Sequence, residues 1–176
     1  MSMPKRYHPL LVGLHWLIAL LVIFMLGVGK FFLSSLPNDA AKVMPLGMHM
    51  VSGIVIGTLM LVRLVVRYKT PKPEKATTGN ALLDAIGVMT HGLLYVLVFA
   101  MAFSGMGISQ SAGLPGVVFG GQGSLPQDFF TIPARLGHGL VSTLLLLLVL
   151  LHVGAALYHQ FIKKDNLLAR MWFGPR

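Results

Sequence analysis

Long runs without a formal charge divide the chain into four apolar segments. The runs cover 23 residues between Arg6 and Lys30, 20 between Lys42 and Arg63, 43 between Asp84 and Asp128, and 27 between Arg135 and Lys163. A helix needs about 20 mostly apolar residues to cross a membrane, and only the first part of the third run is apolar enough. The pattern predicts four membrane-spanning helices, at about 10–30, 45–67, 84–109 and 136–162.

The connections between these segments are short, so neighbouring helices are expected to be antiparallel. We predict an all-α fold: a single integral membrane four-helix bundle over residues 1–176. The first apolar run is longer than the roughly 7–15 residues of a signal-peptide core, and no A-x-A-like cleavage site follows it. We therefore expect this segment to be retained as the first helix.

The composition agrees with a membrane protein and excludes several other classes. Hydrophobic residues make up 55% of the chain, charged residues only 11%, and the mean hydropathy is +0.77. A soluble enzyme and a disordered chain are both excluded by these values. The absence of cysteine excludes disulfides, iron–sulfur clusters, zinc–cysteine sites and haem attached through C-x-x-C-H.

The formal net charge is +9, but the basic residues border apolar runs and form no stripe for nucleic acid. The predicted topology places 11 of the 14 basic residues on one side of the membrane, together with both chain ends. By the positive-inside rule this side is cytoplasmic, so we expect a multi-pass membrane protein with both chain ends inside. The Gly/Pro-rich 110–133 loop is expected to cover the outer end. The 11 residues are Lys5, Arg6, Arg63, Arg67, Lys69, Lys72, Lys75, Lys163, Lys164, Arg170 and Arg176.

Histidines inside the predicted helices are the candidate chemical groups, because polar residues are costly in a membrane and usually face the interior. A lone histidine is more simply a hydrogen-bonded packing residue. In the last helix, however, His152 follows His138 by 14 residues, which corresponds to roughly 21 Å along the axis and nearly the same face. One helix therefore presents two imidazoles at two depths.

The first two helices supply a partner at each depth. His15 lies near the inner end of the first helix, at the level of His152, and His49 lies near the outer end of the second, at the level of His138. Imidazole is a good axial ligand of haem iron. The two pairs predict two stacked b-type haems, each bound by two histidines.

Residues near these pairs have two interpretations each. Gly53 and Gly57 continue the stripe of His49 and leave room for a flat macrocycle, or they serve ordinary small-residue helix packing. Arg63 returns to nearly the same face at the inner level and pairs with a haem propionate or a quinone oxygen, or it extends to the membrane surface. Arg135, one turn before His138, allows the same two interpretations.

Two further helical histidines lie on the cytoplasmic side. His159 is seven residues beyond His152 on the same face, and His91 lies near the start of the third helix. Neither has an obvious partner at a third haem level. An imidazole beside the inner haem can donate a proton to a reduced quinone; the alternative for both is simple interfacial solvation. His8 precedes Pro9 and is expected to be solvated.

Several sequence motifs resemble the bacterial cytochrome b-561 family, and together they cover nearly the whole chain. They are Gly13-Leu14-His15-Trp16-Leu17, His49-Met50-Val51-Ser52-Gly53, Val62-Arg63-Leu64, Leu136-Gly137-His138, the run Leu151-His152-Val153-Gly154-Ala155-Ala156-Leu157-Tyr158-His159, and the run Lys164-Asp165-Asn166-Leu167-Leu168-Ala169-Arg170-Met171. The resemblance implies a four-helix inner-membrane protein with two b haems, bound at His15, His49, His138 and His152.

The resemblance also implies a reaction. Family members related to superoxide oxidase pass electrons from periplasmic superoxide to ubiquinone at the cytoplasmic side, and the quinone region corresponds to His159 with the basic loop around Lys72 and Lys75. The outer side of this chain carries three basic and two acidic residues. A net charge this small attracts an anionic donor only weakly.

Two alternatives stand beside electron transfer from superoxide to ubiquinone. The first is a cytochrome b subunit that relays electrons between quinone and a redox partner protein, which would bind the 110–133 loop. The second is a proton or metal transporter that uses the histidines. The absence of carboxylates within the predicted spans argues against the transporter, as does the wide spacing of the histidines along each helix.

Overall fold

The computed structural model describes residues 4–74 and 77–174, and Lys75 and Arg176 lie outside them. The described residues are mostly helical and contain no strand. In chain order the elements are α1 (Pro9–Gly27), the π-helix η1 (Val28–Leu33), α2 (Ala40–Lys69), α3 (Ala81–Ser111), α4 (Leu114–Gly120), the short 3-10 helix η2 (Phe129–Thr131), α5 (Pro133–Leu157), the π-helix η3 (Tyr158–Lys163) and α6 (Leu167–Arg170).

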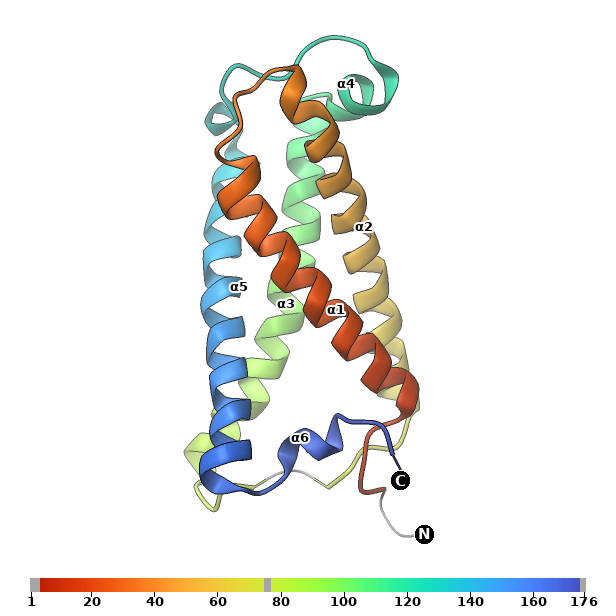
Figure 1. Cartoon of the computed structure of the whole chain (residues 1–176), viewed down its shortest axis with the longest axis vertical. Helices are drawn as coiled ribbons and strands as arrows, with labels where there is room; N and C mark the ends of the chain where they lie inside the picture. Colours follow the sequence, from red (N-terminus) through yellow and green to blue (C-terminus); the bar gives the residue numbers. More distant parts are fainter. Residues whose placement is uncertain (1–3, 75–76, 175–176) are drawn as a thin grey trace.

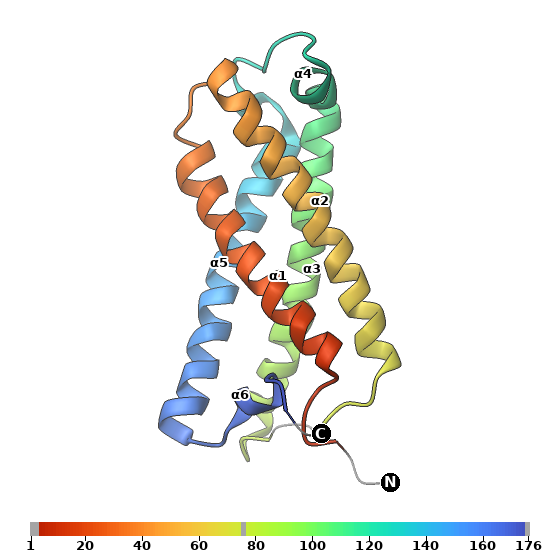
Figure 2. The same ribbon diagram turned by 45° about the vertical axis from the view of Figure 1, so that its right-hand side comes forward.

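Four long helices form an elongated bundle, in which α1 crosses the others obliquely (Figure 1). Four helical segments are long and apolar enough to cross a membrane: Pro9–Leu33, Ala40–Lys69, Ala81–Ser111 and Pro133–Lys163. The predicted helical membrane bundle is confirmed. Both chain ends lie at one end of the bundle, which we name the inner end, and α4 lies at the opposite, outer end (Figures 1 and 2).

The α2 and α3 helices begin earlier than their apolar patterns predict, because polar residues cap them. The Asp39 carboxylate accepts from the Ala41 amide at 2.9 Å and starts α2 five residues before Pro45, which lies inside the helix. The Asn80 side chain accepts from the Leu82 and Leu83 amides and starts α3. Such caps satisfy amides that have no partner within the helix.

The core lies on one face of α1. Leu14, Ile18, Val22 and Leu26 recur every four residues, and all four are buried against the other long helices. This spacing keeps side chains on one stripe of a helix. A second, smaller cluster (Ile108, Leu114 and Leu125) forms under the 110–133 segment at the outer end.

The long helices do not pack evenly around the bundle. α5 packs closely along α3, and α1 packs along α2, whereas α5 makes few close backbone approaches to α1 and still fewer to α2. Side chains of α5 therefore reach α1 and α2 across a wider space than they reach α3.

Residues 164–174, which include α6, run across the inner end and form what we call the C-terminal strap (Figures 1 and 2). Its backbone carbonyls accept hydrogen bonds from the N-terminal part of the chain. The donors are the Tyr7 amide to Arg170 O (3.1 Å), Arg6 Nη1 to Phe173 O (2.8 Å) and Trp16 Nε1 to Met171 O (2.8 Å).

Candidate functional site

The structure brings together one histidine pair at each end of the bundle. At the outer end, the rings of His49 on α2 and His138 on α5 have centres 6.3 Å apart and planes inclined by 71°. At the inner end, the rings of His15 on α1 and His152 on α5 are also 6.3 Å apart, with planes inclined by 78°. We call these the outer pair and the inner pair.

The spacing within each pair fits a metal ion held between two imidazoles. A metal–imidazole bond is about 2.0 Å long and the ring centre lies about 1.1 Å beyond the nitrogen, so two opposed ligands have centres about 6.2 Å apart. The observed 6.3 Å in both pairs agrees with this value. No group of three or more His, Asp or Glu side chains that could hold a metal ion occurs among the described residues.

The outer pair faces an apolar cavity to which all four long helices contribute. Apart from the two imidazoles its lining is glycine, alanine and larger apolar side chains: Val22, Met25, Leu26, Gly53, Ile56, Val98, Met101, Ala102 and Leu145. The α5 helix, which carries one histidine of each pair, approaches α1 and α2 less closely than it approaches α3. Apolar walls, two facing imidazoles and separated helices are what a flat haem requires of a bundle core.

The two glycines predicted to make room differ in their surroundings. A Cβ on Gly53 would meet no atom within 4 Å, and Gly53 lines the cavity, so its position is open. A Cβ on Gly57 would lie 3.3 Å from the Cβ of Ala102, so Gly57 serves close packing of α2 on α3. A third glycine that sequence reasoning missed, Gly29, lies against the outer pair: a Cβ there would be 3.2 Å from His49 Cε1.

The Nδ1 atoms of the outer pair have different environments. His138 Nδ1 lies 2.9 Å from the hydroxyl of Ser104 on α3. His49 Nδ1 is buried and has no hydrogen-bond partner among the residues that the structure describes. Ser104 is a second residue that sequence reasoning missed, since a lone serine in an apolar helix carries no distinctive signal.

Arg63 is buried inside the bundle rather than extended to the membrane surface. Only 9% of the residue is exposed, its guanidinium hydrogen-bonds the Tyr95 hydroxyl, and it lies 5.1 Å from the centre of the Tyr95 ring. Within the described part of the chain the sole ion pair joins His159 and Asp165, so Arg63 faces no carboxylate. A buried guanidinium without an anion favours the interpretation in which Arg63 binds an anionic or carbonyl oxygen.

Arg135 is half-buried at the outer end. Its guanidinium lies 4.9 Å from the centre of the Phe130 ring, and a Cβ on Gly139 would approach its Nη1 to 3.0 Å. The nearby Lys42 is buried, and its ammonium donates to Leu36 O and Asn38 Oδ1, both at 2.8 Å. Lys42 therefore stabilises the loop before α2, whereas N–H groups of the Arg135 guanidinium remain available to other partners.

His91 lies beside the inner pair. Because the Asn80 cap starts α3 at Ala81, His91 lies well inside the helix, and its ring centre is 5.3 Å from that of His152. His91 Nδ1 is 2.7 Å from Gly87 O, which can only accept, so Nδ1 carries the proton. Nε2 of a neutral His91 is then free to accept a hydrogen bond beside the inner pair.

His159 lies in η3 and pairs with the strap. Its Nδ1 is 2.5 Å from Asp165 Oδ2, and the two side chains are 19% and 37% exposed. Partial desolvation raises the pKa of Asp165, but hydrogen bonds from His159 and the Leu167 amide outweigh it and hold that pKa below its ordinary value. The carboxylate therefore orients the imidazole, an arrangement that fits a proton-exchanging histidine.

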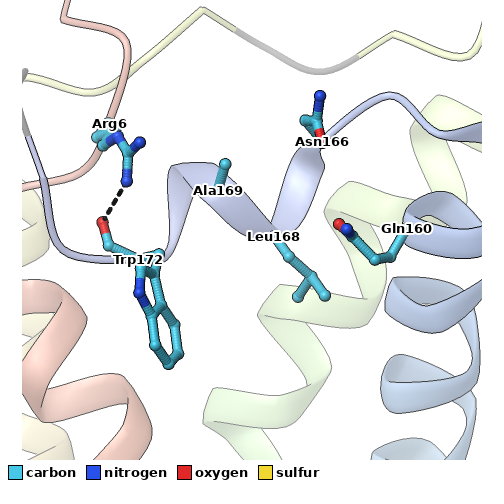
Figure 3. Close-up of a pocket in the computed structure, with 6 residues that line it drawn as sticks. All are labelled: Arg6, Gln160, Asn166, Leu168, Ala169 and Trp172. Atoms are coloured by element: carbon cyan, nitrogen blue, oxygen red, sulfur yellow. Dashed lines mark hydrogen bonds between the residues drawn. The ribbon is translucent and has the colours of Figure 1, made fainter.

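An open pocket lies between η3 and the C-terminal strap (Figure 3). Its lining residues are Arg6, Gln160, Asn166, Leu168, Ala169 and Trp172. Gln160 and Asn166 each immediately follow one member of the His159–Asp165 pair in sequence. Lys72, predicted to lie in the same region, has its ammonium 5.5 Å from the Tyr68 ring centre, and Lys75 is outside the described residues.

Comparison with known proteins identifies the family. The prokaryotic cytochrome b561 family matches residues 6–174. The chain is 32% identical to "Cytochrome b562" of Cereibacter sphaeroides over 97% of this chain and 98% of that protein. It is 28% identical to "Probable superoxide oxidase CybB" of Yersinia pestis, over 96% of this chain and 97% of the relative, and 28% identical to "Cytochrome b561 homolog 2" of Escherichia coli, over 96% and 92%.

The family match covers all four long helices, both histidine pairs and the C-terminal strap. The resemblance seen in the sequence motifs is thereby confirmed. The chain belongs to the prokaryotic cytochrome b561 family of bacterial multi-pass membrane electron-transfer proteins, and this membership implies a b-type haem cofactor.

Proposed function

We propose that this protein binds two b haems and carries electrons across the bacterial inner membrane, from a periplasmic donor to ubiquinone at the cytoplasmic side. The observation that carries the proposal is the presence of two imidazole pairs, each with ring centres 6.3 Å apart, at opposite ends of one bundle. The family implies b haem, and the number of haems and the ligands proposed here go beyond it.

His15 and His152 would hold the inner haem, and His49 and His138 the outer haem. The haems supply reversible one-electron chemistry. Each histidine would bind its haem through a ring nitrogen that carries no proton. The buried apolar stripe of α1 keeps water away from the bundle interior, and Gly53 leaves the wall of the outer cavity open.

Arg63 and Tyr95 together would bind an oxygen anion at the inner level, either a haem propionate or a reduced quinone oxygen. The buried guanidinium supplies several donors and the Tyr95 hydroxyl orients it. Arg135 would serve a propionate at the outer mouth, where its guanidinium lies above the Phe130 ring.

We place quinone reduction at the inner end. His159, oriented by Asp165, would deliver the proton that a reduced quinone needs, and its partly exposed side chain would recover a proton from water. His91, beside His152, is a second candidate proton donor. Lys72, with Lys75, would attract the polar quinone head group to this face.

Superoxide is the donor that the relatives favour, because one of them is named a probable superoxide oxidase. Two superoxide ions release two molecules of oxygen and two electrons. These electrons and two protons from the cytoplasmic side reduce one ubiquinone to ubiquinol. The weak outer charge means that steering of the anion rests on local groups such as Arg135 rather than on the field of the whole surface.

A relay between quinone and a partner oxidoreductase is the second candidate. Phe119 on α4 and Phe130 in η2 are 61% and 60% exposed at the outer end, and such side chains are suited to contact with a partner protein. Family membership favours either form of electron transfer over a histidine-based proton or metal transporter.

The haem content of the purified protein tests the proposal directly. We expect a red preparation with two haems per chain and sharp low-spin b-type bands after reduction. A colourless protein from haem-replete cells, or one haem per chain, would contradict the di-haem proposal.

Rapid mixing distinguishes the donors. Superoxide is expected to reduce the haems far faster than ascorbate, and a soluble ubiquinone analogue is expected to reoxidise them. Reduction by superoxide no faster than by ascorbate would exclude the superoxide role and favour a protein donor at the outer end.

A further inference from the structure

We propose that Ser104 is a positioning residue for His138: its hydroxyl holds the imidazole with the proton on Nδ1 and strengthens it as an electron donor to the outer haem. This inference rests on the proposed ligand role of His138. It adds a residue on α3, a helix that contributes no ligand to either pair.

The hydrogen-bond directions follow from the number of protons. The Ser104 hydroxyl is 2.6 Å from Ala100 O, 3.2 Å from Met101 O and 2.9 Å from His138 Nδ1. Carbonyl oxygens only accept, so the single hydroxyl proton is donated to the Ala100 carbonyl, one turn earlier in the same helix. The serine oxygen then accepts, and His138 Nδ1 donates its proton to it.

This arrangement fixes which nitrogen of His138 binds a metal. A neutral imidazole has one proton, so Nδ1–H leaves Nε2 as the nitrogen with a free lone pair. The hydrogen bond also limits rotation of the ring about its side-chain torsions, because Ser104 is itself held to its own helix. A hydrogen-bond acceptor beyond a metal-binding histidine is the usual way to set its orientation and to raise its basicity.

The two rings of the outer pair differ in this respect. His138 has the Ser104 acceptor, whereas His49 Nδ1 is buried without a partner among the described residues. Most of the surrounding side chains are apolar, so water does not compete with the hydrogen bond between Ser104 and His138. His138 is therefore the stronger donor of the two ligands, and it favours the ferric state of the outer haem.

Replacing Ser104 by alanine tests this role without adding bulk. We expect the midpoint potential of the outer haem to rise in Ser104→Ala and the potential of the inner haem to stay unchanged. The ferric electron paramagnetic resonance signal of the outer haem should shift with it, since a weaker ligand changes the splitting of the iron orbitals. The outer haem is identified as the one that His49→Ala removes.

Two variants separate positioning from a general loss of packing. Ser104→Thr keeps a hydroxyl that can bond the preceding turn, and it should restore a potential close to that of the wild type. Ser142→Ala removes a buried hydroxyl from α5, four residues after His138, whose one hydrogen bond among the described residues goes to Gly139 O at 2.8 Å. This control should leave both potentials unchanged.

The outcomes distinguish this inference from the proposed function. A rise in Ser104→Ala that Ser104→Thr reverses, or selective loss of the outer haem in Ser104→Ala alone, supports the role of Ser104. An unchanged outer potential in Ser104→Ala, or an equal shift in Ser142→Ala, overturns it while the haem ligands stand. If His49→Ala removes no haem, both the proposed outer ligands and the role of Ser104 are wrong.

Discussion

Histidine is costly inside a membrane, and each of the four paired histidines faces another ring inside the bundle. The sequence alone is enough to pair these residues, because each helical residue adds about 1.5 Å along the axis and the depth of each histidine can be calculated. The other residues that surround each histidine pair cannot be predicted from depth. Ser104, Tyr95 and His91 all lie on α3, and their contacts depend on how α3 is rotated against α2 and α5.

The pairing of the histidines predicts which haem each histidine substitution removes. His49→Ala and His138→Ala should each remove one and the same haem, about half of the total, and His15→Ala and His152→Ala should each remove the other. The reason is that each proposed haem depends on both of its imidazoles. Haem per chain and redox titration, which shows which potential is lost, measure the effect.

His8→Asn is the matched control for the histidine substitutions. His8 Nδ1 accepts from the Leu10 amide at 3.2 Å and caps α1, and asparagine can keep that cap. This variant should retain both haems. Loss of the same haem from His15→Ala and His49→Ala would refute the pairing.

At the scale of elements, the C-terminal strap closes the inner end of the bundle. It is fixed by the His159–Asp165 contact and by the hydrogen bond from Trp16 Nε1 to Met171 O, and the Trp16 and Trp172 rings pack with centres 5.7 Å apart. The pKa of Asp165 in the folded protein lies below its ordinary value, so the ionised carboxylate contributes fully to the stability of the strap at neutral pH. This contribution is lost only as the pH falls through that lowered pKa.

Trp16→Phe is predicted to loosen the strap. The substitution keeps an aromatic ring but loses the hydrogen bond to Met171 O, which is worth about 0.5–1.5 kcal/mol and corresponds to about a 2- to 10-fold larger open population. The rate of tryptic cleavage at Lys164 and Arg170 should rise by the same factor when opening is fast relative to cleavage.

Trp172→Phe is the control for this prediction. Trp172 packs on Trp16, but none of the described hydrogen bonds uses its indole nitrogen. Cleavage should change less than in Trp16→Phe. Equal cleavage rates in the two variants would show that ring packing, rather than the hydrogen bond, holds the strap.

At the scale of the whole molecule, the unequal distribution of basic residues predicts the orientation in the membrane. Most of the described basic residues of the cytoplasmic group belong to the segment before α1, the end of α2, η3 and the C-terminal strap. These segments lie at the inner end of the bundle, and α4 lies at the other end (Figure 1). This orientation puts the outer pair near the periplasm and the inner pair near the cytoplasm. The direction of the proposed electron transfer depends on it.

Reporter fusions test the orientation. Green fluorescent protein at the C-terminus should be fluorescent, because it folds in the cytoplasm. Alkaline phosphatase inserted near Gly121 should be active, because it needs the oxidising periplasm. The reverse result at the two positions would invert the proposed direction of electron transfer.

The sequence by itself determined the four spans, the common end of the two chain termini and the depth at which each histidine lies. These properties depend on hydrophobic run length, charge placement and the constant rise of a helix, all of which are local. The tertiary structure decided that Gly57 packs against Ala102 while Gly53 lines a cavity, that Arg63 is buried on Tyr95, and that Ser104 meets His138. These contacts depend on the rotation and crossing of neighbouring helices, which packing of the whole bundle sets and no single segment encodes.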